Sequence, residues 1–460
     1  MDHNSFREKV KDMNVLVVGL GKSGKAATEA LTEIGACVSV QDASDTSKID
    51  PEFLAYLDER NIKAYLGCLP DDLKAYDMLV LSPGVPPEKD FIREAEANGA
   101  EIIGELELAY RLTPAHFIAI TGTNGKTTTT TLVGEIFKRS GRKTSVVGNI
   151  GDPVVAEAVK AGEDAWMVTE VSSFQLETTK YFKPVVSAIL NLTPDHLNRH
   201  KTMEAYGNAK ARIAVEQDEN EFLVVNQDDP AVLELAKQSR AHIIPFSRRV
   251  KLDFGAFVDD SAIIVKDFDG TEYFICSTTD LNIIGDHNVE NVLAAASIAY
   301  FAGIDPVVIS EAVKAFPGVE HRIEFTGRYN GVEYYNDSKG TNVDAAIIAI
   351  KALKNNIILI AGGDGKAQDF TDLAKHLNGA VDALVLLGRD AYQIEEAARK
   401  EGFTEIFNCS DMEECVRKAS EIAREGDKVL LSPACASWDM YTSYEVRGKH
   451  FKQCVKDLLG

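Results

Sequence analysis

Short apolar runs alternate with helix-compatible stretches along almost the whole chain. Runs such as Asn14–Val18, Phe117–Ile120 and Val185–Leu190 are short and almost continuously apolar, which is typical of strands buried on both faces of a parallel sheet. Stretches able to form helices follow most of these runs, and turns rich in Gly or Pro separate the two kinds of segment. The pattern therefore predicts an α/β fold with mostly parallel sheets.

The length of the chain, 460 residues, suggests about three domains. Turn-rich segments near residues 111–114 and 317–319 supply two boundaries. We expect residues 1–113 to form a Rossmann-like domain, residues 114–319 a central P-loop-type domain and residues 320–460 a second Rossmann-like domain. Inside the central domain, residues 253–279 alternate apolar and polar positions around Asp-Gly turns, which predicts an antiparallel ribbon.

Composition and charge narrow the choice of partners. The net charge of −22 should repel nucleic acid and anionic membranes. No apolar run approaches the roughly 18 residues of a membrane span, and the N-terminal residues lack the apolar core of a signal peptide. Seven scattered cysteines without a C-x-x-C pair indicate neither a disulfide framework nor a zinc site. We expect a cytoplasmic protein that binds anions only through local turns and metal ions.

One motif, Thr121-Gly-Thr-Asn-Gly-Lys-Thr-Thr128, follows the apolar run that ends at Ile120. Its glycines allow backbone N–H groups to face a single hollow, and a helix N-terminus adds positive potential there. Lys126 supplies a cation for the outer phosphates and Thr127 a hydroxyl for Mg²⁺. The motif departs from the usual phosphate loop because Ile120 stands where the first Gly would be. We interpret it as a triphosphate cradle; the alternative is a Gly-rich turn before an ordinary helix.

A second glycine-rich turn, Gly19-Leu-Gly-Lys-Ser-Gly24, follows the first apolar run of the chain. Asp42 stands about 20 residues beyond it, at the end of the next predicted strand, as in a nucleotide-binding βαβ unit. The alternative is a closely packed strand–helix turn that binds no ligand.

Several polar side chains follow predicted strands, and each has two interpretations. Glu170 either holds Mg²⁺ or is solvated, and His196 either binds metal or phosphate or caps a loop. Lys210 in a predicted helix would ordinarily be a solvated lysine. The stretch Asp337–Thr341 suits a substrate carboxylate or a plain helix N-cap. Cys435 has no evident His or Asn partner nearby, so we interpret it as structural.

Taken together, these motifs resemble the Mur ligase family, whose members form amide bonds with ATP during peptidoglycan precursor synthesis. The resemblance covers the whole length in three domains. Four segments are most similar to the D-glutamate-adding branch of the family: Gly19–Gly24, Val171–Glu177, Asn336–Asn342 and Leu431–Asp439. Sibling ligases carry different turns at the position of Asn336–Asn342.

The resemblance implies ATP and two Mg²⁺ ions as cofactors, and UDP-N-acetylmuramoyl-L-alanine and D-glutamate as substrates of a monomeric enzyme. It implies that Lys126, Lys210 and His196 are catalytic, and that Lys210 is carbamylated. The implied metal ligands are Thr127, Glu170, His196 and Lys210. The implied ATP contacts are Gly122, Thr123, Asn124, Gly125, Lys126, Thr127, Thr128, Asn288, Asn291, Arg322 and Asp337. The implied contacts to the UDP-linked substrate are Lys22, Ser23, Asp42, Ser82, Asn149, Ser172 and Gln175. The implied contacts to D-glutamate are Lys339, Thr341, Lys366, Ser437, Trp438 and Tyr444.

Three positions depart from the family pattern. Trp438 and Tyr444 stand where some relatives have Leu and Phe, and Ala43 stands where a hydroxyl residue can help to bind uracil. Two other classes of function explain only part of the sequence. A dinucleotide-dependent oxidoreductase leaves the Lys126 loop unexplained, and a non-catalytic nucleotide sensor leaves the turns of the third domain unexplained.

Overall fold

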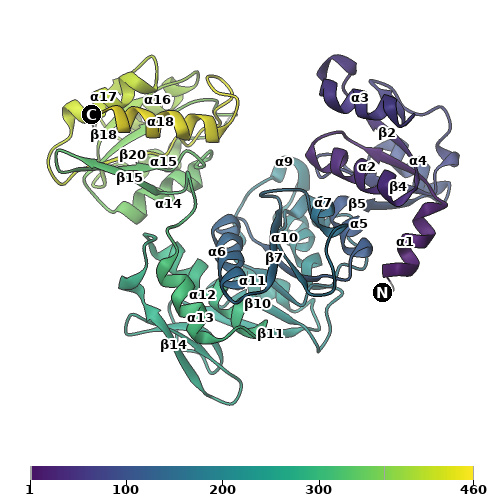
Figure 1. Ribbon diagram of the computed structural model, residues 1–460. Coiled ribbons are helices and arrows are strands. Elements are labelled where there is room, and N and C mark those ends of the chain that lie inside the picture. Colours follow the sequence, from purple (N-terminus) through teal and green to yellow (C-terminus); the bar gives the residue numbers. More distant parts are fainter. Residues whose placement is uncertain (1–2, 367, 459–460) are drawn as a thin grey trace. The chain divides into compact units, whose positions relative to one another are not determined.

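The computed structural model describes residues 3–366 and 368–458, and its strands form three sheets. The chain divides into two compact units (Figure 1). Residues up to Asp280 together with Glu290–Ala315 form the first unit, which contains two of the sheets. Leu281–Val289 and the chain from Phe316 onward form the second unit, with the third sheet. The predicted α/β fold with mostly parallel sheets is confirmed, while the boundaries near residues 113 and 319 stay predictions.

The first sheet is parallel throughout, in the order β3-β2-β1-β4-β5. Its central strand carries Val15–Val18, which are at most 1% exposed, because helices cover both faces of a parallel sheet. Its strands are β1 (Asn14–Val18), β2 (Cys37–Asp42), β3 (Lys63–Leu66), β4 (Met78–Leu81) and β5 (Glu101–Gly104). Its helices are α1 (His3–Lys11), α2 (Lys22–Ile34), α3 (Pro51–Glu59), α4 (Asp90–Ala97) and α5 (Glu105–Leu112).

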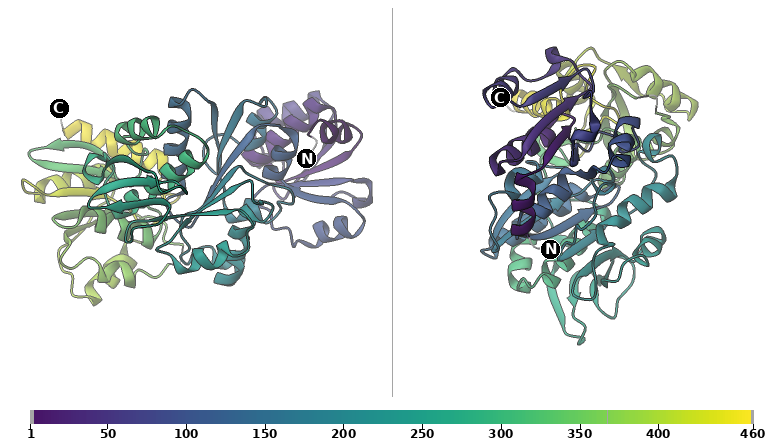
Figure 2. Two further views of the ribbon diagram at one scale, coloured as in Figure 1. Left: turned by 90° about the horizontal axis from the view of Figure 1, so that it is seen from below. Right: turned by 90° about the vertical axis from the view of Figure 1, so that its right-hand side faces the viewer.

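The second sheet runs β14-β13-β12-β11-β10-β9-β6-β8-β7. Its strands are β6 (His116–Thr121), β7 (Lys143–Gly148), β8 (Ala165–Glu170), β9 (Val186–Ile189), β10 (Phe222–Asn226), β11 (His242–Ser247), β12 (Gly255–Asp259), β13 (Ala262–Lys266) and β14 (Glu272–Ser277). Neighbouring strands from β7 to β12 are parallel, whereas β12, β13 and β14 pair antiparallel. The ribbon predicted at residues 253–279 is therefore confirmed, and it can be followed in teal-green in Figures 1 and 2.

The helices of this region vary in length, and several consist of a single turn. They are α6 (Lys126–Arg139), α7 (Val154–Ala158), α8 (Ser173–Leu176), α9 (Leu197–His200), α10 (Met203–Ala211), α11 (Pro230–Ala236), α12 (Asp286–Phe301) and α13 (Pro306–Ala315). Helices this short are marginal alone, so tertiary contacts must hold α8 and α9 in place.

The third sheet runs β15-β16-β20-β17-β18-β19, and only β15 pairs antiparallel among its described strands. Its strands are β15 (Glu324–Tyr329), β16 (Val332–Asn336), β17 (Ile357–Ala361), β18 (Val381–Leu386), β19 (Ile406–Asn408) and β20 (Lys428–Leu431). Its helices are α14 (Val343–Leu353), α15 (Thr371–Lys375), α16 (Ala391–Lys400), α17 (Met412–Ile422) and α18 (Tyr444–Leu458). Because β16, β20 and β17 are parallel neighbours, the turns that follow them lie at one edge of the sheet.

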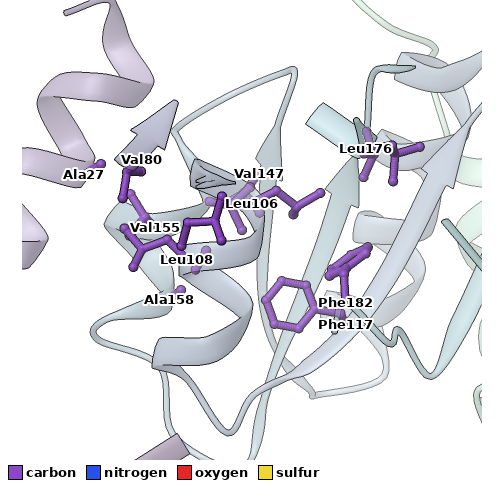
Figure 3. Packing of buried hydrophobic residues seen from close by; sticks show 14 of the residues in the cluster. Ala27, Val80, Leu106, Leu108, Phe117, Val147, Val155, Ala158, Leu176 and Phe182 are labelled. Atoms are coloured by element: carbon purple, nitrogen blue, oxygen red, sulfur yellow. The ribbon is translucent and has the colours of Figure 1, made fainter. Parts of the chain in front are cut away.

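A single hydrophobic cluster joins the first two sheets. Leu106 and Leu108 of α5 pack near Val155 and Ala158 of α7, as Figure 3 shows. Farther along the same cluster, the ring of Phe117 in β6 meets that of Phe182 edge to face, with centroids 5.6 Å apart (Figure 3). The two sheets therefore share a core, consistent with their grouping in one compact unit.

A buried carboxyl group lies at this junction. Glu105, the first residue of α5, is 1% exposed. Its Oε1 accepts a hydrogen bond from the backbone N–H of Val155 at 2.6 Å, and its Oε2 has no hydrogen-bond partner among the described residues. Burial raises the pKa of Glu105 to about 7, although backbone N–H groups of Val155 and Val154 act in the opposite direction.

We expect Glu105→Gln to remove a pH dependence of stability. The pKa of Glu105 in the fold lies above its ordinary value of 4.5. The contribution of the protonated carboxyl group to the free energy of unfolding is therefore fully present below pH 4.5 and is lost as the pH rises through about 7. The loss amounts to about 3 kcal/mol for a shift of this size. Chemical denaturation at about pH 5 and about pH 8 measures it, with the exposed Glu163→Gln as control. An equal loss in wild type and Glu105→Gln would contradict this account.

Candidate active site

The glycine-rich loop predicted as a phosphate cradle connects β6 to α6. β6 ends at Thr121, and α6 begins at Lys126 directly after Gly125, which has φ +83°. The Nζ atom of Lys126 donates hydrogen bonds to the carbonyl oxygens of Gly122 and Thr123, both at 2.8 Å. The strand, turn and helix predicted around this motif are therefore present, with Lys126 and Thr127 in the first turn of the helix.

Helix α12 approaches the loop closely where a glycine stands. A Cβ atom added to Gly125 would lie 2.2 Å from Oδ1 of Asn291, so only glycine fits both this contact and the positive φ. The hydroxyl of Thr129 donates to the same oxygen at 3.3 Å. Asn291, predicted to contact ATP, thus lies against the phosphate loop. Asn288, one turn earlier, donates from Nδ2 to the carbonyl oxygen of Ile284 at 2.8 Å.

A second lysine reaches the same loop. Lys210 in α10 is 1% exposed, and its Nζ donates to the carbonyl oxygen of Gly122 at 2.7 Å. Burial lowers the pKa of Lys210 well below its usual value, and the charge of Lys126 lowers it further, against the opposing charges of Asp195 and Glu170. The alternative of a solvated lysine is wrong. Its amine loses its proton far more readily than a surface lysine does.

Glu170, at the end of β8, is also buried, with 1% of its surface exposed. Its Oε1 accepts a hydrogen bond from Nδ2 of Asn149 at 2.8 Å, and its Oε2 has no hydrogen-bond partner in the described part of the chain. The alternative of a solvated glutamate is therefore wrong. A buried carboxylate oxygen without a donor fits a hard divalent cation such as Mg²⁺, which binds oxygen ligands.

His196 directly precedes the one-turn helix α9. Its backbone has φ +54°, and its Nε2 lies 3.5 Å from Oδ2 of Asp195, with half of its side chain exposed. Its ring contacts that of Phe174, with centroids 4.9 Å apart. The imidazole is thus accessible, while its neighbours restrict its orientation.

Hydrogen bonds to the side chains of Asp42 and Ser82 hold the turn Gly19–Gly24 in place. Asp42 accepts from the backbone N–H of Leu20 at 2.7 Å, and the hydroxyl of Ser82 donates to the carbonyl oxygen of Gly19 at 2.7 Å. A Cβ atom on Gly24 would lie 1.8 Å from that same oxygen. Burial acts to raise the pKa of Asp42, but backbone N–H groups outweigh it and the pKa lies below its usual value. Lys22 is exposed and Ser23 partly exposed at the start of α2.

A cavity of about 570 Å³ opens beside this turn. Gln41 and Ala43, the neighbours of Asp42, line it together with residues from the segment after β3 and from the start of α4. These are Gly67, Cys68, Leu69, Lys89, Asp90 and Phe91. The cavity has the size of a small-molecule site. Ala43, which departs from the family pattern, lies in its wall.

Ser172 and Gln175 form a reciprocal cap at the start of α8. The backbone N–H of Gln175 donates to Oγ of Ser172, while Oε1 of Gln175 accepts from the backbone N–H of Ser172 at 2.9 Å. The cap satisfies orphan N–H groups of a very short helix. Both predicted substrate contacts therefore stand at one fixed helix end.

In the second unit, the turns after β16, β17 and β20 meet at one sheet edge. Asp364 and Ala436 exchange backbone hydrogen bonds at 2.9 Å, and the N–H of Ala434 donates to the carbonyl oxygen of Gly340 at 2.9 Å. Four of the six residues predicted to contact D-glutamate form two pairs. Lys339 lies over the ring of Tyr444 at 5.7 Å and Lys366 over that of Trp438 at 4.6 Å. Ser437 is buried, and Thr341 is partly buried just before the N-cap of α14.

Asp337 is buried. It is not a helix N-cap, which was one of the two interpretations of the stretch Asp337–Thr341. The cap of α14 is Asn342, which accepts from the N–H of Ala345 at 2.8 Å. Asp337 instead accepts from the hydroxyl of Ser432 at 2.7 Å. Burial raises the pKa of Asp337 to about 6, against the nearby charge of Arg322. The thiol of Cys435 is buried too, and its pKa is raised to about 12 by burial, which agrees with a structural role.

Comparison with known proteins gives matches along most of the chain. Family profiles match residues 13–104 as a MurD-like N-terminal domain, residues 120–299 as a Mur ligase middle domain and residues 321–435 as a Mur ligase glutamate ligase domain. A UDP-N-acetylmuramoylalanine–D-glutamate ligase of Thermoanaerobacter sp. (strain X514) is 47% identical over 453 residues, 98% of this chain and 99% of the relative. A protein of the same name from Clostridioides difficile (strain 630) is 48% identical over 450 residues, with the same coverage of both chains. The chain belongs to the Mur ligase family.

Solved structures place the fold of this Mur ligase in the same group. A pseudomurein peptide ligase type C from Methanothermus fervidus superposes with a TM-score of 0.59 at 22% identity, covering 97% of this chain and all of that one. A UDP-N-acetylmuramate-alanine ligase from Thermotoga maritima gives 0.59 at 19% identity, with the same coverage. At this identity the likeness concerns the three-domain α/β fold alone. Over the described residues, no helix has the length and apolarity to cross a bilayer.

One residue that holds the phosphate loop of this Mur ligase was not predicted from the sequence. Oδ1 of Asn191, just beyond β9, accepts hydrogen bonds from the N–H groups of Thr123 at 3.1 Å and Asn124 at 2.8 Å. The hydroxyl of Tyr206 lies 3.3 Å from Oγ1 of Thr123. The signal available was the position of Asn191 directly after an apolar run, but only the pairing of β9 with β6 brings it to the loop.

An acidic cluster in the second unit was also not foreseen. Ligand atoms of Glu320, His321 and Glu324 lie within 4.8 Å of one another. Nζ of Lys452 lies 3.0 Å from Glu320 Oε1 and 2.6 Å from Glu324 Oε1. Nδ2 of Asn336 lies 2.8 Å from Nδ1 of His321. Since an ammonium group already compensates both carboxylates, we assign no metal here.

Proposed function

We propose that this Mur ligase joins D-glutamate to the alanine carboxylate of UDP-N-acetylmuramoyl-L-alanine, using ATP and releasing ADP and phosphate. One observation carries the proposal: Lys126 and the buried Lys210 donate to the same carbonyl oxygen of the phosphate loop. Relatives that share 47–48% of their residues with nearly the whole chain bear the name of that ligase. A cytoplasmic location, a monomeric state and the two domain boundaries belong to the proposal as sequence-based predictions.

The phosphate loop would hold the triphosphate of ATP. The backbone N–H groups at Gly122–Gly125 and the N-terminus of α6 favour anions, and Lys126 adds a mobile cation. Thr127, Glu170, His196 and Lys210 would hold two Mg²⁺ ions, to which Glu170 offers a buried oxygen without a donor. The metal, when bound, neutralises charge on the phosphates. Asn288, Asn291, Arg322 and Asp337 remain the proposed contacts to the nucleoside and phosphates.

Lys210 fits these ions better as a carbamate than as an ammonium. An ammonium beside two divalent cations would repel them, whereas burial already favours its neutral form. The neutral amine attacks CO₂, the new N–C bond forms as one C=O π bond opens, and one proton leaves to solvent, so the neutral amine becomes an anion with two oxygen ligands.

The chemistry then takes two steps. An oxygen of the alanine carboxylate attacks the γ-phosphorus atom of ATP, ADP leaves, and an acyl phosphate forms. The neutral amine of D-glutamate attacks its carbonyl carbon, the C–O bond breaks, inorganic phosphate leaves, and the nitrogen loses a proton. The ammonium of Lys126 stabilises the negative charge that develops on the transferred phosphoryl group.

The UDP-linked substrate would bind the first sheet. The turn Gly19–Gly24 with Lys22 and Ser23 suits the diphosphate, and the 570 Å³ cavity beside Asp42 suits the uracil and ribose. Asn149, Ser172 and Gln175 stand farther along the same unit, and Asn149 contacts Glu170. Ser82 closes the turn through its bond to Gly19.

The D-glutamate site would lie at the three turns of the third sheet. Two ammonium groups, on Lys339 and Lys366, match the two carboxylates of the amino acid. Ser437, Thr341 and Tyr444 supply hydroxyl groups, and Trp438 supplies a ring on which Lys366 rests. This arrangement suits a small dicarboxylate in a protein whose net charge is −22.

We expect Lys339→Ala to raise the KM for D-glutamate by about ten- to a hundredfold, because one charge-assisted hydrogen bond is lost. The KM for ATP should change much less, and L-glutamate should not serve as a substrate. Steady-state kinetics with each substrate varied in turn measure this, with the exposed Lys351→Ala of α14 as control. Equal changes in both constants, or equal use of L-glutamate, would refute this assignment of the pocket.

The function itself is tested by product analysis. The protein is mixed with ATP, UDP-N-acetylmuramoyl-L-alanine and D-glutamate, and each component is omitted in turn. We expect UDP-linked alanyl-glutamate together with equal amounts of ADP and phosphate only in the complete mixture. ADP release that ignores both other substrates would favour a nucleotide-sensing module. Reduction of a nicotinamide dinucleotide, tested alongside, would favour an oxidoreductase.

A further inference from the structure

His200, which the sequence analysis did not single out, lies at the centre of a buried contact set in the first unit. The residue is 8% exposed. Its Nε2 lies 3.0 Å from Oγ of Ser173, and its Nδ1 lies 3.5 Å from Oε1 of Glu177. Its ring stacks on Phe174, with centroids 5.4 Å apart and planes at 27°, and packs against Tyr206 at 5.2 Å.

The protonation of this set follows from its partners. Because the carboxylate of Glu177 only accepts hydrogen bonds, we assign the ring proton of His200 to Nδ1, so that Nε2 accepts from the Ser173 hydroxyl. Nη2 of Arg199 lies 2.5 Å from Oε2 of Glu177 and pairs with that carboxylate. The arrangement resembles a Ser–His–Glu triad, but Ser173 is only 2% exposed, which argues against a nucleophile.

The set joins two elements that cannot hold themselves in place. α8 and α9 are helices of four residues each, far shorter than a helix that is stable alone. Ser173 begins α8, Glu177 follows its end, and His200 closes α9. The contact of Phe174 with His196 on the other side, at 4.9 Å, completes the link between the two helices.

Both short helices carry residues of the proposed site. Ser172 and Gln175 cap α8, and His196 directly precedes α9. We propose that His200 is a positioning residue, which fixes α8 against α9 through Ser173 and Glu177 and thereby sets the spacing between Ser172, Gln175 and His196. This inference rests on the proposed function, because it assumes that α8 binds the UDP-linked substrate and that His196 meets phosphate or metal.

The test compares variants that separate packing from polar contact. His200→Phe keeps a ring between Phe174 and Tyr206 but loses both polar partners. His200→Gln places an oxygen near the position of Nε2 and can again accept from Ser173. Ser173→Ala removes the same contact while leaving the imidazole in place, so it serves where His200→Phe fails to fold. The exposed His242→Phe, on β11, is the matched control.

We expect His200→Phe and Ser173→Ala to raise the KM for UDP-N-acetylmuramoyl-L-alanine by about tenfold, since misplacement of binding groups is costly. The KM for ATP should stay within about twofold, and His200→Gln should recover most of the loss. The double variant His200→Phe with Ser173→Ala should be no worse than the poorer single variant, because both remove one shared contact.

Other outcomes overturn the inference. An unchanged KM for the UDP-linked substrate in both single variants would remove His200 from positioning. A parallel rise in both KM values with a lower melting temperature, without rescue by His200→Gln, would show a purely structural role. Failure of the proposed function is distinguishable, since the unmutated protein would then give no UDP-linked product at all.

Discussion

Replacing Lys126 by alanine should lower the rate of ADP formation by about a thousandfold, because removal of one preorganised charge at a reacting phosphate costs several kcal/mol. Nζ of Lys126 already sits at the mouth of the loop, on the carbonyl oxygens of Gly122 and Thr123. Single-turnover measurement of ADP with saturating substrates reads the chemical step directly. Circular dichroism and melting temperature establish that the variant is folded.

The same helix offers a control for this prediction. Lys138 lies in the last turn of α6, half exposed, 3.2 Å from Glu135. Lys138→Ala removes a lysine from the same element without touching the loop, and its turnover should stay within about twofold, as surface ion pairs contribute little. Turnover of Lys126→Ala near that of Lys138→Ala would exclude the loop lysine from phosphoryl transfer.

Replacing Lys210 by arginine should cost about as much, roughly a thousandfold in turnover, because a metal ligand is lost and a permanent cation replaces it. Arginine cannot form the carbamate, and its guanidinium remains charged even when buried. The direct readout is incorporation of isotope-labelled bicarbonate into one lysine, followed by mass spectrometry of the intact protein. Depleting CO₂ should slow the wild-type enzyme reversibly.

Two further variants serve as a rescue experiment and a control for this prediction. Lys210→Ala leaves a space that a short carboxylic acid can enter, and acetate should restore part of its activity. Lys237→Arg, on an exposed lysine that pairs with Glu234 in α11, should behave like wild type. If Lys210→Arg keeps most of its turnover, or if no label is found on the lysine of an active enzyme, the carbamate is ruled out.

Local motifs were predictable because their information is contiguous in sequence. The phosphate loop, the turn Gly19–Gly24 and the ribbon of β12–β14 each follow from residues a few positions apart. Asn191 illustrates the opposite case, since its bonds to Thr123 and Asn124 depend on strands that pair far apart in the chain. His200 was missed for the same reason, because Ser173 and Glu177 come from another segment.

Besides long-range contacts, the burial of individual polar side chains could not be predicted from the sequence alone. A helical lysine such as Lys210 is ordinarily solvated, and the sequence allowed Glu170 to be either a metal ligand or a solvated side chain. In the structure both residues are 1% exposed. Their burial arises where the ends of β6 and β8 meet α10, which no local pattern encodes. For Asp337 the competing interpretation failed because Asn342 provides the helix cap instead.

The closed turn between β1 and α2 also bears on drug resistance. Side chains cannot be added at Gly24 without colliding with the carbonyl oxygen of Gly19, which would lie 1.8 Å away. A compound that bound the backbone of this turn at Gly24 would contact a position where every added side chain collides with the fold. Resistance through Gly24 would thus be excluded, and substitutions would arise elsewhere, such as in the walls of the neighbouring cavity, where Ala43 and Cys68 are exposed.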